Sequence, residues 1–158
     1  MRGKLWLGAA AAALMALGVS PAFAQSADQP GDASTTAVLS GDIEGDVSPA
    51  GDTDWFRLSV TLGQAYSIAL AGVPAADGAT LDPMLAIFDA EGNQLAFNDD
   101  ANESLNAALR YTPAQSGTVF VEARAFNPEA TGGYRLGVLE STAPPDDFSS
   151  DTTTRGRL

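Results

Sequence analysis

The stretch Leu81–Asp100 reads LDPMLAIFDAEGNQLAFNDD, and the rest of the chain can be interpreted outward from it. It contains two β-prone runs, 85–88 (LAIF) and 94–97 (QLAF), on either side of the short loop 89–93 (DAEGN). Gly92 in this loop is free to adopt a positive φ. Two such runs around a short loop that contains glycine predict a β-hairpin.

Oxygen-bearing side chains stand at the two outer ends of this predicted hairpin. Asp82 precedes the first strand, and Asn98, Asp99 and Asp100 follow the second. The outer ends of antiparallel strands lie side by side, so these groups should converge and repel one another unless a cation joins them. Ca²⁺ suits such oxygen ligands, and Asp54 could complete the set if its turn packs alongside. We therefore expect a calcium site here, the alternative being that each acid only caps its own turn.

The segments on both sides of the hairpin continue the β pattern. In 55–62 (WFRLSVTL) and 66–70 (YSIAL) apolar and polar residues alternate, as in half-buried antiparallel strands. With 43–47, 109–112 and two later runs we predict an all-β, two-layer antiparallel β-sandwich of jelly-roll or Greek-key type with about eight strands. The expected core includes these apolar residues: Phe56, Leu58, Val60, Ile68, Leu85, Ile87, Val119, Val121, Leu136 and Val138. Aromatic residues at strand spacing are expected in the core too: Phe56, Tyr66, Phe88, Phe97, Tyr111, Phe120 and Tyr134.

The first 24 residues have the features of a secretory signal peptide. Arg2 and Lys4 form a basic start, 5–19 is apolar, and Ala22-Phe23-Ala24 fits the small-x-small cleavage rule. A membrane anchor is the alternative, but a spanning helix needs ~20 apolar residues and this run is shorter. We expect cleavage before Gln25 and export to the periplasm or medium of a bacterium.

The remaining chain divides into three parts by composition. We predict a flexible lead-in over 25–36, the sandwich domain over 37–140, and a linker and tail over 141–158. The end of the tail, 151–158 (DTTTRGRL), weakly echoes 32–39 (DASTTAVL). The tail therefore either opens a truncated second repeat or is disordered, and eight residues do not decide between the two.

The composition excludes most kinds of enzyme. The chain contains no Cys and no His, and its one Lys lies in the predicted signal peptide, so Ser-His-Asp triads, thiol nucleophiles and Schiff bases are excluded. Asp99 and Asp100 are adjacent and make a poor acid–base pair, because neighbouring strand residues point to opposite faces. The formal net charge is −12 and becomes −14 once Arg2 and Lys4 are removed. We predict a protein that is not an enzyme and does not bind nucleic acid.

Taken in order, five motifs resemble the bacterial pre-peptidase C-terminal domain family. They are GDTDWFRL (51–58), LGQAYSIAL (62–70), LDPMLAIFDAEGNQLAFNDD (81–100), TPAQSGTVFVEA (112–123) and GGYRLGV (132–138). The resemblance covers residues 41–139 and implies a secreted β-sandwich that accompanies peptidases and other exported enzymes. Such domains are credited with substrate attachment, surface retention or help in maturation. Relatives related to the collagen-binding domains of clostridial collagenases bind calcium.

Two classes of function follow from these expectations. The first is an exported, non-catalytic accessory or binding module, stabilised by calcium, that attaches to an extracellular protein or glycan polymer or assists a secreted peptidase. The second is a structural or assembly subunit of the cell surface or periplasm that associates with itself. Aromatic or Arg side chains clustered on one sheet face would favour the first class. An unpaired edge strand would favour the second. Neither class requires insertion into a membrane after the signal is cleaved.

Overall fold

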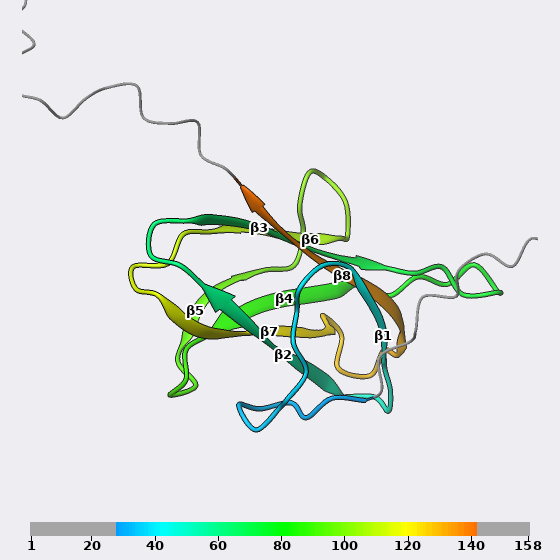
Figure 1. The fold of residues 1–158 in the computed structure, drawn as a ribbon. Helices are drawn as coiled ribbons and strands as arrows, with labels where there is room; N and C mark the ends of the chain where they lie inside the picture. The colour runs from blue at the N-terminus through cyan, green and yellow to red at the C-terminus, as the bar shows by residue number, and fades with distance from the viewer. Residues whose placement is uncertain (1–27, 142–158) are drawn as a thin grey trace, which may run out of the picture.

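The computed structural model describes residues 28–141, which form eight strands in two packed layers (Figure 1). The strands are β1 (Ile43–Val47), β2 (Thr53–Val60), β3 (Ala65–Gly72), β4 (Pro83–Phe88), β5 (Gln94–Asn98), β6 (Ala107–Tyr111), β7 (Gly117–Ala125) and β8 (Gly132–Ser141). This part of the chain holds no helix of the length and apolarity needed to cross a membrane. The predicted signal peptide and most of the predicted tail lie outside the described residues.

The strands pair in the nested order of a jelly roll. One sheet has the order β1-β8-β3-β6 and the other β2-β7-β4-β5, and every pairing is antiparallel. The first strand therefore lies beside the last, the second beside the seventh, the third beside the sixth, and the fourth beside the fifth. A long antiparallel ribbon that closes at the β4–β5 turn and then rolls up gives this arrangement. The prediction of an all-β jelly-roll sandwich is confirmed.

The β4–β5 hairpin is the closed end of that ribbon, and its turn is formed by the predicted loop 89–93. The backbone N–H of Asp89 donates to the carbonyl of Asn93 (3.0 Å), and Asp89 Oδ1 accepts from the N–H of Asn93 (2.8 Å). Gly92 has a φ of 81°, a conformation that glycine adopts without a steric penalty. Leu85 pairs with Asn98, so the two outer ends of the hairpin meet as expected.

The core lies between the inner faces of the two sheets. Nine of the ten predicted core residues are buried, and Val138 is partly buried against them. Tyr66 and Tyr134 are buried as well, whereas Tyr111 packs against the core from a partly buried position. Each such side chain contributes about 1.5–3 kcal/mol of burial free energy. The alternation along β2 and β3 therefore gave the correct inward face.

Three aromatic residues predicted for the core lie instead on the outer face of β2-β7-β4-β5. Phe88 pairs with Phe120, and Phe97 pairs with Ala86, all on the side away from the other sheet. The Phe97 side chain is 56% exposed. Phe120 is nevertheless buried on this face, as predicted, with 4% of its surface exposed. For Phe88 and Phe97 the prediction was wrong because both faces of these strands carry apolar residues, so the period of two does not distinguish inside from outside.

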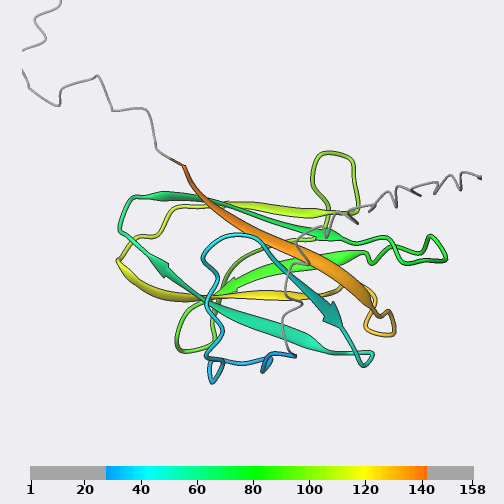
Figure 2. The same cartoon turned by 45° about the vertical axis from the view of Figure 1, so that its right-hand side comes forward.

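The segment 28–40 lies beside β2 and covers its free edge (Figure 2). Trp55 N–H donates to the carbonyl of Pro30 (3.3 Å), and Arg57 N–H donates to the carbonyl of Ala37 (2.8 Å). Leu39 N–H donates to the carbonyl of Arg57 (2.9 Å), and Thr35 is buried. The sequence pattern does not predict this contact, because these hydrogen bonds come from backbone groups. The contact fixes the position of the N-terminal end of the domain.

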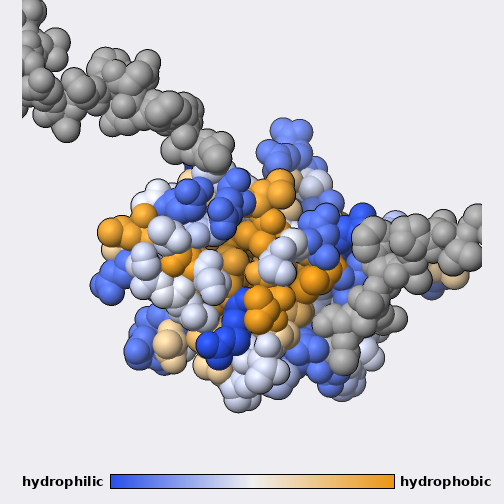
Figure 3. Space-filling model, in the orientation of Figure 1, coloured by the Kyte–Doolittle hydropathy of each residue, from blue (hydrophilic) through white to orange (hydrophobic). Residues whose placement is uncertain are grey.

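One side of the sandwich is less completely closed. β1 pairs with Gly132–Leu136 of β8 only, so within the described chain residues 137–141 lack a strand partner on that side. Val38 is 61% exposed there and lines a hollow of about 430 Å³. Leu139 of β8 is 72% exposed on the outer face. Figure 3 shows hydrophobic residues gathered in the middle of this view, where Figure 1 has β1, β2 and β8.

Candidate functional site

Among residues 28–141, one group of three acidic side chains brings its oxygen atoms within 4.8 Å of one another. It consists of Asp28, Asp52 and Asp54, and we call it the N-terminal cluster. Asp28 comes from the segment beside β2, Asp52 from the turn before β2, and Asp54 from β2 itself. Oxygen atoms that bind one Ca²⁺ at 2.3–2.6 Å are at most about 5 Å apart, so the spacing fits a single ion.

Asp54 is the buried member of the cluster, with only 2% of its surface exposed. Its Oδ2 accepts from the hydroxyl of Tyr134 (2.5 Å), and its Oδ1 accepts from the backbone N–H of Gln29 (2.8 Å). Burial raises the pKa of Asp54, and the charges of Asp52 and Asp28 raise it further, whereas the two hydrogen bonds act in the opposite direction. A positive ion would offset both the burial and the repulsion.

Asp52 is held in place by its own turn. Its Oδ1 accepts from the N–H of Thr53 (2.9 Å) and its Oδ2 from the N–H of Ser48 (3.0 Å). Asp52 and Asp54 lie two residues apart, so both project to the same face of the strand. The ligands are all oxygens, which favours a hard cation such as Ca²⁺ over Zn²⁺ or Cu²⁺. These residues could therefore hold a metal ion.

The residues predicted from the hairpin lie together at its outer end, and we call Asp82, Asn98, Asp99 and Asp100 the hairpin-end cluster. Burial raises the pKa of Asp82, and the charges of Asp100 and Asp99 raise it further. Asp82 Oδ1 is buried without a hydrogen-bond partner in the described chain. The three carboxylates nevertheless do not approach within 4.8 Å of one another as those of the N-terminal cluster do.

Two members of the hairpin-end cluster have structural partners. Asn98 Nδ2 donates to the carbonyl of Asp100 (3.0 Å), and Asn98 Oδ1 accepts from the N–H of Ala108 (3.1 Å), which links β5 to β6 across the two sheets. Asp99 Oδ1 accepts from the N–H of Asp100 (3.1 Å). Asp54 lies in the same row of the sheet as Leu85 and Asn98, but β7 separates its strand from β4. The predicted set of five is thus divided between two places, and a role for the hairpin-end cluster in metal binding stays a prediction.

A different surface is formed by the outer face of β2-β7-β4-β5. The rings of Trp55 and Phe88 stack with centroids 4.5 Å apart, and Phe120 lies 5.8 Å from Trp55. The Arg57 guanidinium lies 5.8 Å above the Phe120 ring. Phe97 of β5 is exposed at one end of this face. We call it the aromatic–arginine face and define it by these residues: Trp55, Arg57, Phe88, Phe97, Phe120, Glu122 and Arg124. Arg57 and Phe97 are exposed, Phe88 and Arg124 are partly buried, and Trp55, Phe120 and Glu122 are buried.

The charge of this face differs from that of the molecule. Its one acidic residue, Glu122, accepts from Trp55 Nε1 with Oε1 (3.3 Å) and pairs with Arg124 Nε through Oε2 (3.2 Å). Arg57 is exposed and has no acidic partner in the described chain. The face therefore combines apolar rings with positive charge in a protein whose formal net charge is −12.

Comparison with known proteins identifies similar folds. No family model and no curated protein matches the chain. Among solved structures, the pre-peptidase C-terminal domain of a collagenase from Bacillus anthracis is similar, with a TM-score of 0.50 and 16% identity over 64% of this chain and 90% of that one. A second structure is PliG of Aeromonas hydrophila, a periplasmic inhibitor of g-type lysozyme, with a TM-score of 0.49 and 12% identity over 66% of this chain and 88% of that one. A third is CorA of Methylomicrobium album BG8, a surface-associated copper-binding protein, with a TM-score of 0.46 and 12% identity over 65% of this chain and 96% of that one.

At these identities the likeness is one of fold. It agrees with the resemblance to the pre-peptidase C-terminal domain that the five motifs predicted. The motifs predicted a β-sandwich, and the structure has eight strands in two sheets around the 81–100 hairpin. The chain has the fold of the pre-peptidase C-terminal domain.

Proposed function

We propose that this protein is an exported, non-catalytic binding module that attaches to an extracellular polymer, protein or glycan, or assists a secreted enzyme. The fold supports this proposal, because a pre-peptidase C-terminal domain shares it. The composition supports it too, since the chain has neither His nor Cys to serve as a nucleophile or a base at neutral pH.

The aromatic–arginine face is the observation that carries the proposal. Exposed aromatic and Arg side chains are enriched where proteins bind partners, because they provide contact area and directional hydrogen bonds together. Phe97 is 56% exposed, and Arg57 stands over Phe120 with its guanidinium available to a ligand, whereas Trp55 and Phe120 are themselves buried. An open sheet face of this kind suits an extended polymer rather than a small molecule in a closed pocket.

We further propose that Ca²⁺ stabilises the domain through the N-terminal cluster. The ion would join Asp28 of the N-terminal segment to Asp52 and Asp54 at the start of β2. This would hold the segment 28–40 on the β2 edge, where it contributes backbone hydrogen bonds. The hairpin-end cluster is the second candidate for the same ion.

A structural or assembly role is supported by a separate feature, the half-open edge of β8. Residues 137–141 lack a strand partner on one side within the described chain, and Leu139 is 72% exposed beside them. An extended strand from another molecule could pair there. This role predicts association that depends on protein concentration, which the binding-module proposal does not require.

The test is a sedimentation assay of the exported protein with insoluble collagen, peptidoglycan and cellulose, each with calcium and with chelator. We expect at least one polymer to retain the protein. Phe97→Ala combined with Arg57→Ala should abolish retention. Leu105→Ala, which removes a side chain that is 58% exposed away from this face, is the matched control and should have no effect.

Two results would contradict the binding-module proposal. One is retention that persists unchanged in the Phe97→Ala, Arg57→Ala variant. The other is no retention by any polymer together with reversible oligomers in analytical ultracentrifugation that Leu139→Glu dissolves. The second result would favour the assembly role.

A further inference from the structure

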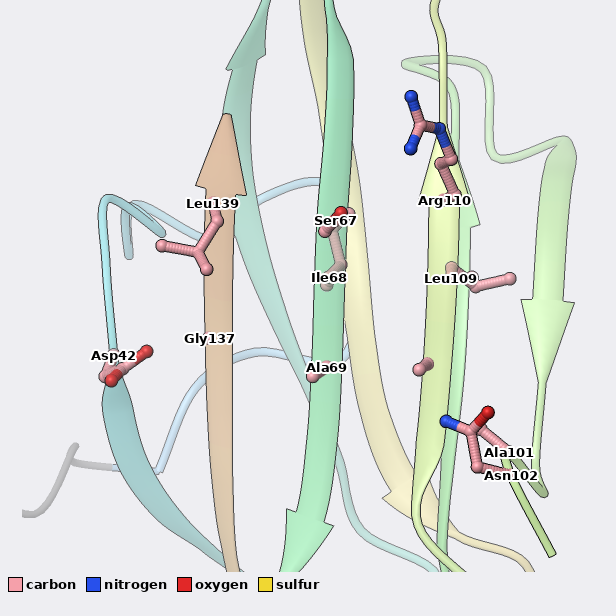
Figure 4. A pocket seen from close by; sticks show the side chains of 11 residues that line it. Asp42, Ser67, Ile68, Ala69, Ala101, Asn102, Leu109, Arg110, Gly137 and Leu139 are labelled. Atoms are coloured by element: carbon pink, nitrogen blue, oxygen red, sulfur yellow. The ribbon is translucent and has the colours of Figure 1, made fainter. Parts of the chain in front are cut away.

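The outer face of the other sheet, β1-β8-β3-β6, contains a shallow trough of about 410 Å³. Its floor is a row of small residues from three neighbouring strands, Gly137 of β8, Ala69 of β3 and Ala108 of β6, which are paired in register. Figure 4 shows this row crossing the sheet, with larger side chains at its ends and along one side. Such a floor allows the backbone of a ligand to approach the sheet closely.

Oppositely charged groups stand toward the two ends of the trough. Asp42 lies at the β8 end, whereas Arg110 lies on β6 on the far side of β3 (Figure 4). Both are exposed, and neither side chain forms a hydrogen bond or an ion pair within residues 28–141, although the charge of Asp42 also acts on Arg135 of β8. A Cβ at position 137 would lie 2.3 Å from Asp42 Oδ1, so the glycine leaves the space that this carboxylate occupies over the strand.

The remaining polar groups of the trough can both donate and accept hydrogen bonds. Ser67 adds a hydroxyl from β3, and Asn102 adds an amide from the loop before β6. Leu139, 72% exposed, forms an apolar wall. The lining contains no aromatic ring, and ring stacking is the usual means of holding a sugar. Amide and hydroxyl partners between opposite charges suit a peptide better than a glycan.

The separation of the two charges sets the length of the ligand. The carboxylate of Asp42 lies over Gly137 of β8, two strand intervals from β6, and Arg110 lies two residues further along the strands, in the row of Ser67 and Leu139. Two intervals of about 4.8 Å and an offset of two residues of about 3.3 Å each place the two charges roughly 12 Å apart, and an extended peptide advances about 3.3 Å per residue. About four residues therefore bridge the two charges.

We propose that this trough binds a short extended peptide of about four small residues, with its amino group on Asp42 and its carboxylate on Arg110. The charges of the site and of the ligand are complementary at both ends, and the Gly-Ala-Ala floor selects small side chains. The site lies on the opposite sheet from the aromatic–arginine face. It therefore adds a second binding activity, and the polymer test above can fail without affecting it.

The test is a calorimetric titration of the mature protein with tetra-alanine, accompanied by backbone NMR shifts. We expect saturable binding with shifts confined to β3, β6 and β8. N-acetylation or C-amidation of the peptide should each weaken binding at least about tenfold, because each removes one charge-assisted contact. Dialanine, which is too short to reach both groups, should bind with similarly reduced affinity.

Protein variants test the same contacts from the other side. Arg110→Ala and Asp42→Asn should each weaken tetra-alanine binding about tenfold, whereas Arg57→Ala on the opposite sheet should leave it unchanged. Ala69→Phe fills the floor with an exposed ring and should abolish binding without unfolding the domain. Circular dichroism and melting curves of each variant verify that the fold is intact.

Three outcomes would overturn the proposal. The first is no binding of tetra-alanine at ~10 mM, about tenfold above a Kd of ~1 mM, the affinity of a weak ligand. The second is equal affinity for the capped and uncapped peptides. The third is a dimer in analytical ultracentrifugation that Arg110→Ala dissolves while no peptide binds, which would assign the trough to a second copy of this chain.

Discussion

The N-terminal cluster and the hairpin-end cluster are both acidic, but they are assembled in different ways. The hairpin-end cluster comes from a single hairpin, and its members point in different directions or accept hydrogen bonds from the backbone. The N-terminal cluster joins a distant segment to the start of β2 and brings its oxygens within 4.8 Å of one another. Among the described residues, the carboxylates of the hairpin end are therefore farther apart than those that the packing of separate segments brings together.

Replacing Asp54 should cause the largest difference in the free energy of unfolding between variants of the two clusters. Asp54→Ala removes the acceptor of Tyr134 and Gln29 and, in our proposal, a calcium ligand. Unpaired buried donors and the lost ion together should lower the free energy of unfolding by about 3–5 kcal/mol in calcium. Urea unfolding measures the change, with Asp99→Ala as the matched control at less than about 1 kcal/mol. Equal losses in the two variants would remove the distinction between the clusters.

Calcium itself should have the next largest effect. A ligand that binds only the folded state adds about 2.7 kcal/mol at a hundredfold excess over Kd, so the melting temperature should rise with calcium and fall with chelator. We expect Asp52→Asn to abolish this rise and Asp99→Ala to retain it. The opposite pattern would place the ion at the hairpin end, as the sequence alone predicts. A melting temperature indifferent to calcium in every variant would mean that both clusters serve their turns only.

A smaller effect is expected from Asn98, whose role is structural. Asn98→Ala leaves the Ala108 N–H without its partner and removes the link between β5 and β6. The loss should be about 1 kcal/mol, the usual net value of one hydrogen bond. It should be the same with calcium and with chelator when measured by urea unfolding. A loss that appears only in calcium would show that Asn98 acts through a metal ion.

The pH dependence of the metal-free protein should give the smallest effect, because hydrogen bonds from Tyr134 and Gln29 partly offset the burial of Asp54. The pKa values of Asp54 and Asp82 are raised above 3.8, so the folded state binds more protons than the unfolded state above that pH. Stability in chelator should therefore increase as pH falls from neutral toward 3.8. The pKa values of Asp32 and Asp89 are lowered below 3.8, so these two residues stabilise the folded state at neutral pH and lose that contribution only as the pH falls below 3.8.

Calcium should reverse this pH dependence, because protons compete with the ion for the same carboxylates. Melting curves between neutral pH and pH 4, recorded with calcium and with chelator, measure the two slopes. Asp54→Asn should flatten the chelator slope. Parallel slopes in the two conditions would contradict calcium binding at carboxylates with raised pKa values.

The strand pattern and the hairpin could be predicted from the sequence because both are local. The alternation covers 56–60 in β2 and 66–70 in β3, and the loop 89–93 carries its own turn chemistry. The acids at the outer ends of the hairpin were located for the same reason. Antiparallel pairing places Leu85 opposite Asn98, and Asp82 lies a few residues from Leu85. Each of these inferences depends on residues near one another in the chain.

The tertiary structure alone decided which groups from distant segments meet. Asp28 joins Asp54 because segment 28–40 pairs with β2 through backbone atoms, and side-chain pattern does not encode such pairing. Phe97 lies outside because both faces of its sheet are apolar, so only the packing of the second sheet selects the buried face. The row Gly137, Ala69 and Ala108 exists only in the register of three strands. Register across strands is set by packing over the whole sandwich, because hydrogen-bonded ladders form equally well in several alignments until side chains are buried.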